Sequence, residues 1–334
     1  MGDTIKYISK IEIHGLWGKF DLEWNLQPDV NVLSGINGSG KTTVLNCVLN
    51  LLRSNDQMRN NELFNGNRSK IDEIGKLISS CKISFDNGLF ILFEFVKKNE
   101  ANLSLNKMED YDTSLYFGIN NDVYITQLIN QHNIDRFLQI DFISTFDNEL
   151  KPYEAIIKVS DSNVETYLDF EIYHLQKKYL DYQINIGKRA FEAISKNNSN
   201  GDVIKVKETQ EKFLGLVDSL FESTGKRINR TENEITFLSG EEKLTAYQLS
   251  SGEKQLLVIL LTVLVQDNKN AILFMDEPEI SLHFDWQKKL IGYIRELNPN
   301  VQIILATHAP AIIREGWMDK VSNIVDLIKP ETKS

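Results

Sequence analysis

The chain has 334 residues, of which 42% are hydrophobic and 25% are charged, and its formal net charge is −10. This length and apolar content are enough to bury a sizeable core, in one large domain or in a domain with an insertion. The acidic balance argues against a simple non-specific DNA binder, although a local patch could still hold nucleic acid.

Short apolar or alternating runs predict strands through the first 150 residues, and polar stretches separate them. The predicted strands are two within 5–26, then 30–34, 82–85, 89–95 and a central strand at 137–146. A glycine-rich loop and a helix over 42–52 follow the strand at 30–34. The polar stretch 54–75 predicts a loop or lid, and 97–122 predicts an irregular or hairpin segment.

The middle of the chain predicts an inserted pair of antiparallel helices. Asn163–Ser195 carries aromatic and apolar residues at helical spacing, 197–202 predicts a turn, and Val203–Phe221 predicts the return helix. Each arm would span at most about 45–50 Å at about 1.5 Å per residue. Two interpretations stay open for residues 160–230: a docking surface for a partner, or a layer that only covers the sheet.

Strands and helices alternate in the last part of the chain, which is typical of a parallel sheet covered on both faces. The predicted elements are strands at 234–239, 271–275 and 301–307, an apolar helix that ends at Val265, and a helix at 286–297. We therefore predict three parts. They are an N-terminal lobe (1–150), a helical insertion (151–235) and a C-terminal lobe (236–334).

The octet Gly35–Thr42, GINGSGKT, fits the phosphate-loop pattern G-x-x-x-x-G-K-[ST] between a strand and a helix. Its backbone N–H groups would cradle phosphate oxygens, and Lys41 would offset the charge of the β- and γ-phosphates. The hydroxyl of Thr42 would ligate Mg²⁺, and Thr43 would contact the α-phosphate. The predicted nucleotide ligands here are Asn37, Gly38, Ser39, Gly40, Lys41, Thr42 and Thr43. The motif predicts ATP and Mg²⁺ as ligands.

A second motif, ILFMDEPE at 272–279, places two carboxylates at the end of an apolar strand. Ligands bind at this end of the strands in open α/β sheets. Asp276 would orient Mg²⁺, and Glu277 would polarise the attacking water. A helix cap is the structural alternative, and the phosphate loop earlier in the chain favours the catalytic interpretation.

A third motif, LSSGEKQ at 249–255, precedes the apolar helix. Free N–H groups at this helix start would form another anion site, with Ser250, Ser251, Gly252 and Glu253 as predicted ligands. Glu253 lies three residues after Ser250, so the pair also fits a capping box. Both interpretations can hold because they use the same helix end.

A fourth motif is the pair Thr307–His308, directly after the strand at 301–307. His308 would contact the γ-phosphate and the attacking water, although a histidine after a strand is more often structural. The predicted catalytic residues are Lys41, Glu277 and His308.

These four motifs, in this order, resemble the ABC ATPase superfamily, and Ser281–His283 resembles its D-loop. The resemblance implies an α/β P-loop ATPase with a mixed, mostly parallel sheet, an N-terminal antiparallel β-subdomain and the inserted helical pair. It also implies a homodimer that sandwiches two ATP molecules. Lys41 of one copy and Ser250 with Gly252 of the other would hold each nucleotide.

The long insertion resembles the soluble branch of the superfamily, which includes SMC-like, RecF-like and OLD-like ATPases. Short arms without a C-x-x-C motif fit the RecF-like and OLD-like members best. The chain ends about 26 residues after His308, which leaves no room for the TOPRIM domain of OLD-like nucleases. We therefore expect any nuclease or other effector to be a separate partner chain.

Three functions follow as alternatives: an ATPase switch for a partner effector in bacterial anti-phage defence, a RecF/SMC-like DNA-repair ATPase, and a transporter subunit. The acidic charge disfavours the second, and the long insertion disfavours the third. Ser251 departs from the commoner glycine of the signature. Gln139 is considered for the family's glutamine loop, and Trp17 and Phe20 for adenine stacking, with a core role favoured for both aromatics.

Two observations predict a cytoplasmic protein that does not span a membrane. Cys47 and Cys81 form neither a disulfide framework nor a zinc site. The N-terminus has no signal-peptide core, and the longest apolar run, Leu256–Val265, is about half the roughly 20 residues of a membrane helix.

Overall fold

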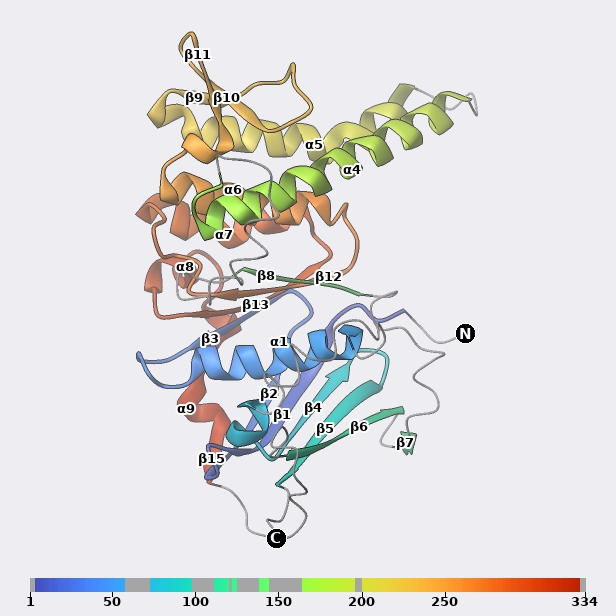
Figure 1. Ribbon diagram of the computed structural model, residues 1–334, viewed down its shortest axis with the longest axis vertical. Coiled ribbons are helices and arrows are strands. Elements are labelled where there is room, and N and C mark those ends of the chain that lie inside the picture. Colours follow the sequence, from blue (N-terminus) through green and yellow to red (C-terminus); the bar gives the residue numbers. More distant parts are fainter. Residues whose placement is uncertain are drawn as a thin grey trace, which may run out of the picture.

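The computed structural model describes residues 4–57, 73–97, 111–119, 122–124, 138–143, 164–195 and 200–330. The described chain forms three sheets with helices around them (Figure 1). Several predicted features lie partly or wholly outside these ranges. They are most of the lid at 54–75, parts of 97–122 and 137–146, the start of the insertion and part of its turn.

A five-stranded parallel sheet forms the centre of the molecule. Its order is β14 (Val321–Asn323), β3 (Val30–Ser34), β13 (Val301–Thr307), β12 (Ala271–Asp276) and β8 (Gln139–Ile143). Successive residues of a strand point to opposite faces. In β12, Leu273 and Met275 accordingly enter one hydrophobic core, and Ile272 and Phe274 enter the other. The near-continuous apolar sequence of this strand follows from burial on both faces.

The strand predicted as central, 137–146, is instead at the edge. Within the described residues β8 pairs only with β12 and ends the strand order. Its residues 139–142 are accordingly half-buried, whereas β12 is fully buried.

A seven-stranded antiparallel sheet forms the N-terminal subdomain, as the resemblance implied. Its order is β15 (Ile328–Pro330), β2 (Phe20–Asn25), β1 (Ile8–Leu16), β4 (Ser80–Phe85), β5 (Leu89–Lys97), β6 (Tyr111–Ile119) and β7 (Asp122–Tyr124). The helix α1 (Lys41–Gln57) lies between this sheet and the parallel sheet (Figure 1). Its apolar side chains fill the space between them, including Val44, Val48 and Leu52.

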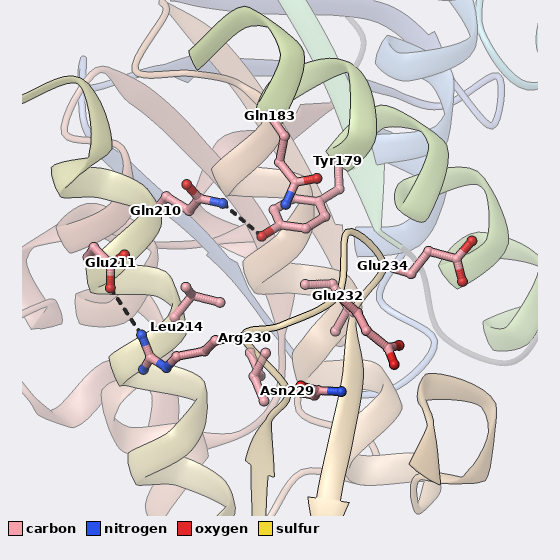
Figure 2. Close-up of a pocket in the computed structure, with 11 residues that line it drawn as sticks. Tyr179, Gln183, Gln210, Glu211, Leu214, Asn229, Arg230, Glu232 and Glu234 are labelled. Carbon is pink, nitrogen blue, oxygen red and sulfur yellow. Dashed lines mark hydrogen bonds and ion pairs between the residues drawn. The ribbon is translucent and has the colours of Figure 1, made fainter. Parts of the chain in front are cut away.

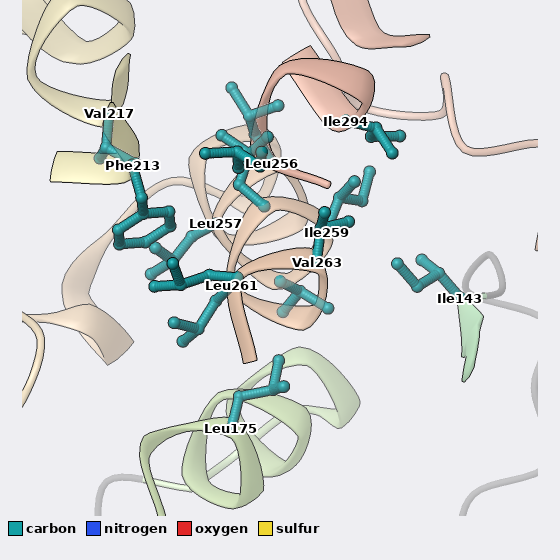
Figure 3. Close-up of a cluster of buried hydrophobic side chains, with 14 of the residues drawn as sticks. Ile143, Leu175, Phe213, Val217, Leu256, Leu257, Ile259, Leu261, Val263 and Ile294 are labelled. Atoms are coloured by element: carbon teal, nitrogen blue, oxygen red, sulfur yellow. The ribbon is translucent and has the colours of Figure 1, made fainter. Parts of the chain in front are cut away.

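The opposite face of the parallel sheet is covered by helices that surround α6 (Ser251–Val265). Because α6 is apolar on all sides, it must be enclosed by protein. Figure 3 shows Leu175 of α4 (Tyr167–Ser195) and Phe213 of α5 (Asn200–Phe221) on different sides of α6, with Ile294 of α7 (Phe284–Leu297) nearby. The helical pair therefore shares a core with the C-terminal lobe, and the predicted boundaries at 151 and 235 stay a prediction.

The two halves of the arm formed by α4 and α5 differ. The proximal half covers α6, whereas the distal half extends beyond the body of the molecule (Figure 1). On the distal half of α4, Ile184, Phe191 and Ile194 are 55%, 71% and 61% exposed. The proximal half of the arm therefore covers the core, and the distal half presents an exposed surface.

The remaining elements complete the described chain. They are η4 (Glu222–Thr224), β9 (Lys226–Ile228), β10 (Thr236–Ser239), β11 (Glu242–Thr245), η5 (Ala246–Gln248), α8 (Pro310–Arg314), η6 (Met318–Lys320) and α9 (Ile324–Leu327). Strands β11, β10 and β9 form the third sheet. Over the described ranges, no helix has the length and apolar character needed to cross a membrane.

Candidate functional site

The predicted phosphate loop joins β3 to α1 at the carboxyl end of the parallel sheet. Gly38 and Gly40 have φ values of 78° and 96°, in the left-handed region that favours glycine. A Cβ on Gly40 would lie 2.2 Å from Cη2 of Trp17, so a larger residue here would have to displace the indole ring. Trp17 in turn packs edge-on against Phe20, with ring centroids 6.4 Å apart. These aromatics therefore brace the loop, and adenine stacking by either stays a prediction.

Two polar groups of the loop are suited to a phosphate. Lys41 is only 4% exposed, and its Nζ donates hydrogen bonds to the carbonyl oxygens of Gly35 (3.0 Å) and Ile36 (3.2 Å). The buried hydroxyl of Ser39 has no hydrogen-bond partner in the described part of the chain. Unpaired buried donors are rare in native structures. Asn37 and Gly38 are exposed beside them, and Thr43 is half-buried.

The loop meets the second motif through Thr42. The Thr42 hydroxyl donates a hydrogen bond of 3.1 Å to Oδ1 of Asp276, the last residue of β12. Burial raises the pKa of Asp276, and the hydrogen bond from Thr42 partly opposes that shift. Mg²⁺ prefers oxygen ligands, so a hydroxyl and a carboxylate in contact fit this ion.

Glu277 and His308 are brought together by neighbouring strands. Strands β12 and β13 are parallel and pair Asp276 with Ala306, so the residues that follow each strand emerge side by side. Nδ1 of His308 lies 3.2 Å from Oε1 of Glu277. Glu277 has a φ of 44°, which is unusual for a residue with a side chain and costs on the order of 1–3 kcal/mol. Strain of this kind clusters at functional sites.

The signature forms the capping box that its spacing predicted. Ser250 is the N-cap of α6, its backbone N–H donates to Oε2 of Glu253 (2.9 Å), and the Glu253 N–H donates to Oγ of Ser250 (3.4 Å). The N–H groups of Ser251 and Gly252 lie in the first helical turn, where N–H groups lack partners within the helix. Gly252 also packs against the D-loop backbone at Ser281.

Glu253 and Lys254 tie the signature to both roots of the arm. The other oxygen of Glu253 accepts hydrogen bonds from Thr224 (2.7 Å) and Lys226 (2.9 Å), just after α5. Lys254 forms an ion pair of 2.7 Å with Asp169 in the first turn of α4. Burial disfavours the charged form of Glu253, but the hydrogen bonds from Lys226, Ser250 and Thr224 outweigh it and lower its pKa.

Gln139 does not join these residues. It pairs with Ala271 at the amino end of β12. Ala271 lies five residues before Asp276, so at about 3.3 Å per residue Gln139 is roughly 16 Å along the sheet from that carboxylate. Its side chain donates to Asp141 (2.9 Å). Glu279 is a buried carboxylate that sequence reasoning did not select, although it ends the D-E-P-E motif.

A separate pocket of about 200 Å³ lies beside the middle of α4 and α5, under the connection between β9 and β10. Figure 2 shows Tyr179 and Gln210 meeting across α4 and α5, with Arg230 and Glu232 on the connection between β9 and β10. None of the motif residues lines it. The pocket therefore belongs to the arm and is distinct from the predicted nucleotide site.

Over most of its length the chain is similar to known proteins. Residues 30–314 match the family described as "AAA domain, putative AbiEii toxin, Type IV TA system". "Retron Vc95 probable ATPase" of Vibrio cholerae serotype O1 biovar El Tor is 21% identical over 90% of this chain and 70% of its own length. "Septu protein PtuA" of Bacillus thuringiensis is 22% identical over 94% of this chain and 74% of its own length.

The solved structure of an Smc head bound to the C-winged helix domain of ScpA has the same fold. It matches with a TM-score of 0.50 and 18% identity, over 92% of this chain and 91% of that chain. The chain therefore belongs to the AAA-domain family that matches residues 30–314, and its fold is that of an SMC head.

Proposed function

We propose that the chain binds Mg-ATP at the phosphate loop and hydrolyses it to ADP and phosphate. The hydrogen bond between Thr42 and Asp276 carries this proposal, because it joins the end of the loop motif to the carboxylate of β12. These two residues would hold Mg²⁺, which when bound neutralises charge on the β- and γ-phosphates. Lys41 would add a second positive charge beside the same phosphates.

In the proposed reaction, Glu277 takes the proton of a water molecule whose oxygen bonds to the γ-phosphorus. The bond between that phosphorus and the β–γ bridging oxygen breaks, and ADP leaves with the bridging oxygen. His308 contacts the same water and the γ-phosphate. Its ring already lies 3.2 Å from the Glu277 carboxylate, which supports a shared task.

The site is proposed to be complete only in a homodimer. Ser250, Ser251, Gly252 and Glu253 of one copy would act on the nucleotide that Lys41 of the other copy holds. Three exposed apolar side chains support such an interface: Ile36 (80% exposed), Ile280 (37%) and Phe284 (57%). They come from the phosphate loop, the position just before the D-loop and the start of α7. A dimer contact there would remove these apolar side chains from water.

The dimer is proposed to be a cytoplasmic switch for a separate effector, such as a nuclease, in bacterial anti-phage defence. The likeness to a retron ATPase and to a Septu protein supports this class of function. The arm supports it physically. A nucleotide bound at Ser250 would act on Glu253 and Lys254, whose ties to Lys226 and Asp169 pass the change to both arm roots. The apolar residues of the distal half would then dock the effector.

The test compares wild type with E277Q, and with E241Q as a control, because Glu241 is an exposed residue in the turn between β10 and β11. E277Q should still bind ATP, hydrolyse it at least about 100-fold more slowly, and have the mass of a dimer with Mg-ATP in light scattering. E241Q should match wild type.

If wild type and E277Q both stay monomeric at saturating ATP, the proposal that two copies share each nucleotide site is wrong. If neither protein binds ATP, the ATPase itself is wrong. Salt-sensitive binding of duplex DNA by the isolated protein would favour the DNA-repair alternative.

A further inference from the structure

Glu279 is a buried carboxylate that the proposed reaction does not use. It is 6% exposed and lies in the loop between β12 and α7. Its Oε1 accepts a hydrogen bond of 2.5 Å from the Thr307 hydroxyl, and its Oε2 has no hydrogen-bond partner among the described residues. Burial raises the pKa of this carboxyl. A buried oxygen without a partner is costly, so the side chain is poorly explained by packing alone.

A second contact favours the Thr307 hydroxyl as the donor in its hydrogen bond with Glu279. The backbone N–H of Ala309 donates to Oγ1 of Thr307 (2.9 Å), so the hydroxyl proton is free to point at Glu279. Thr307 is the last residue of β13, and His308 follows it directly. Glu279 therefore holds the strand end from which His308 projects.

One nitrogen of the His308 ring faces two carboxylates. Its Nδ1 is 3.2 Å from Oε1 of Glu277 and 3.7 Å from Oε1 of Glu279. An imidazole with one nitrogen beside carboxylates has its orientation and tautomer fixed by them. Nε2 then remains for a contact on the other side of the ring.

Glu279 is also fixed through its backbone. Its carbonyl oxygen accepts hydrogen bonds from the backbone N–H of Leu282 (2.9 Å) and the side chain of Gln287 (3.4 Å). These contacts shape the D-loop, whose Ser281 packs against Gly252 of the signature. One residue thus connects the histidine, the D-loop and, through it, the signature.

We propose that Glu279 is a positioning residue, which holds Thr307 and His308 so that Nδ1–H of His308 donates to Glu277 and Nε2 faces the attacking water, from which it can accept a hydrogen bond. This inference rests on the proposed ATPase function. It assigns a task to the final glutamate of the D-E-P-E motif that the motif alone does not reveal.

Kinetics provide the first test, with E279A, T307V, T307S and the control E241Q. E279A and T307V should each lower kcat about tenfold or more, while the Kd for a fluorescent ATP analogue stays within about twofold. T307S keeps the hydroxyl and should behave like wild type. The double variant E279A/T307V should be no slower than E279A, because the two residues act as one unit.

Spectroscopy without nucleotide provides the second test. The chain has five histidines, so ¹⁵N-histidine labelling gives a small set of imidazole signals, and the His308 signal is the one lost in H308N. Wild type and E241Q should carry the proton on Nδ1 of His308. E279A should shift His308 toward a mixture of tautomers. E279Q fills the same space, and it should also disturb the His308 signal if E279A fails to fold.

The two proposals can fail separately. If E277Q is inactive while E279A and E279Q keep wild-type kcat and an unchanged His308 spectrum, only the positioning role is wrong. If E277Q hydrolyses ATP like wild type, the proposed function is wrong.

Discussion

Gly252 and Ser281 are in such close contact that a Cβ on Gly252 would lie 2.3 Å from the Ser281 carbonyl oxygen. The atom in the way belongs to the backbone, and Ser281 is itself held in a left-handed conformation with a φ of 69°. The signature and the D-loop are therefore packed as one unit within a single copy of the chain.

G252A should separate these two segments. We expect a lower urea midpoint and slower ATP hydrolysis, because the added methyl group must displace the D-loop. The matched control is G215A in α5, where a Cβ would meet no atom within 4 Å. Alanine there should stabilise the helix by about 0.5–1 kcal/mol. Equal stability of G252A and G215A would contradict the close packing.

K41M should abolish the response to nucleotide while the fold is retained. In wild type, Mg-ATP at about 100 times its Kd should add about 2.7 kcal/mol of stability, because only the folded state binds it. K41M keeps most of the apolar stem but lacks the charge, so its Tm should not change with Mg-ATP. Lys269 is exposed, and K269A is the control that should respond like wild type. A normal Tm increase in K41M would contradict the assigned role of Lys41.

Glu253 should contribute an acid-sensitive part of the stability. Its pKa is lowered in the folded protein, so its contribution is fully present above the pKa of the unfolded chain, near 4.5. The contribution is lost as the pH falls from there through the lower folded-state pKa. E253Q should therefore be less stable at neutral pH, and the difference from wild type should shrink below about pH 4.5. Urea unfolding across this range measures it, and a constant difference would contradict the prediction.

The ion pair between Lys254 and Asp169 should couple nucleotide to the arm. Removing both charges in D169N/K254M avoids leaving one charge buried alone, which typically costs about 3–5 kcal/mol. Hydrogen exchange of the first turns of α4 should change with Mg-ATP in wild type and not in the double variant. The same ATP-dependent change in both proteins would show that this pair is not the connection.

The predictions from sequence succeeded where a feature depends on adjacent residues. The capping box of Ser250 and Glu253 is fixed by a spacing of three residues. The unbroken apolar run of β12 predicts correctly that both faces of this strand are buried. The edge position of β8 could not be predicted, because a short apolar run has the same pattern in the middle of a sheet as at its border.

Contacts between distant segments were also beyond the sequence. Trp17, in the turn between β1 and β2, lies against Gly40 of the phosphate loop, and no local pattern encodes that approach. Gln139 was considered on its nearness to a strand, and the strand register then placed it at the wrong end of the sheet. The sequence shows a glutamate at position 279, but it does not reveal the hydrogen bond with Thr307, which lies 28 positions later.

The anchoring of the arm at its roots has an evolutionary consequence. Asp169 and Lys226 hold the base to α6, whereas Ile184, Phe191 and Ile194 of the far half are open to solvent. The length and the surface residues of the tip can therefore change during evolution without altering the contacts between the base of the arm and α6. Substitutions at Ile184, Phe191 or Ile194 would accordingly leave the ion pairs at the base in place.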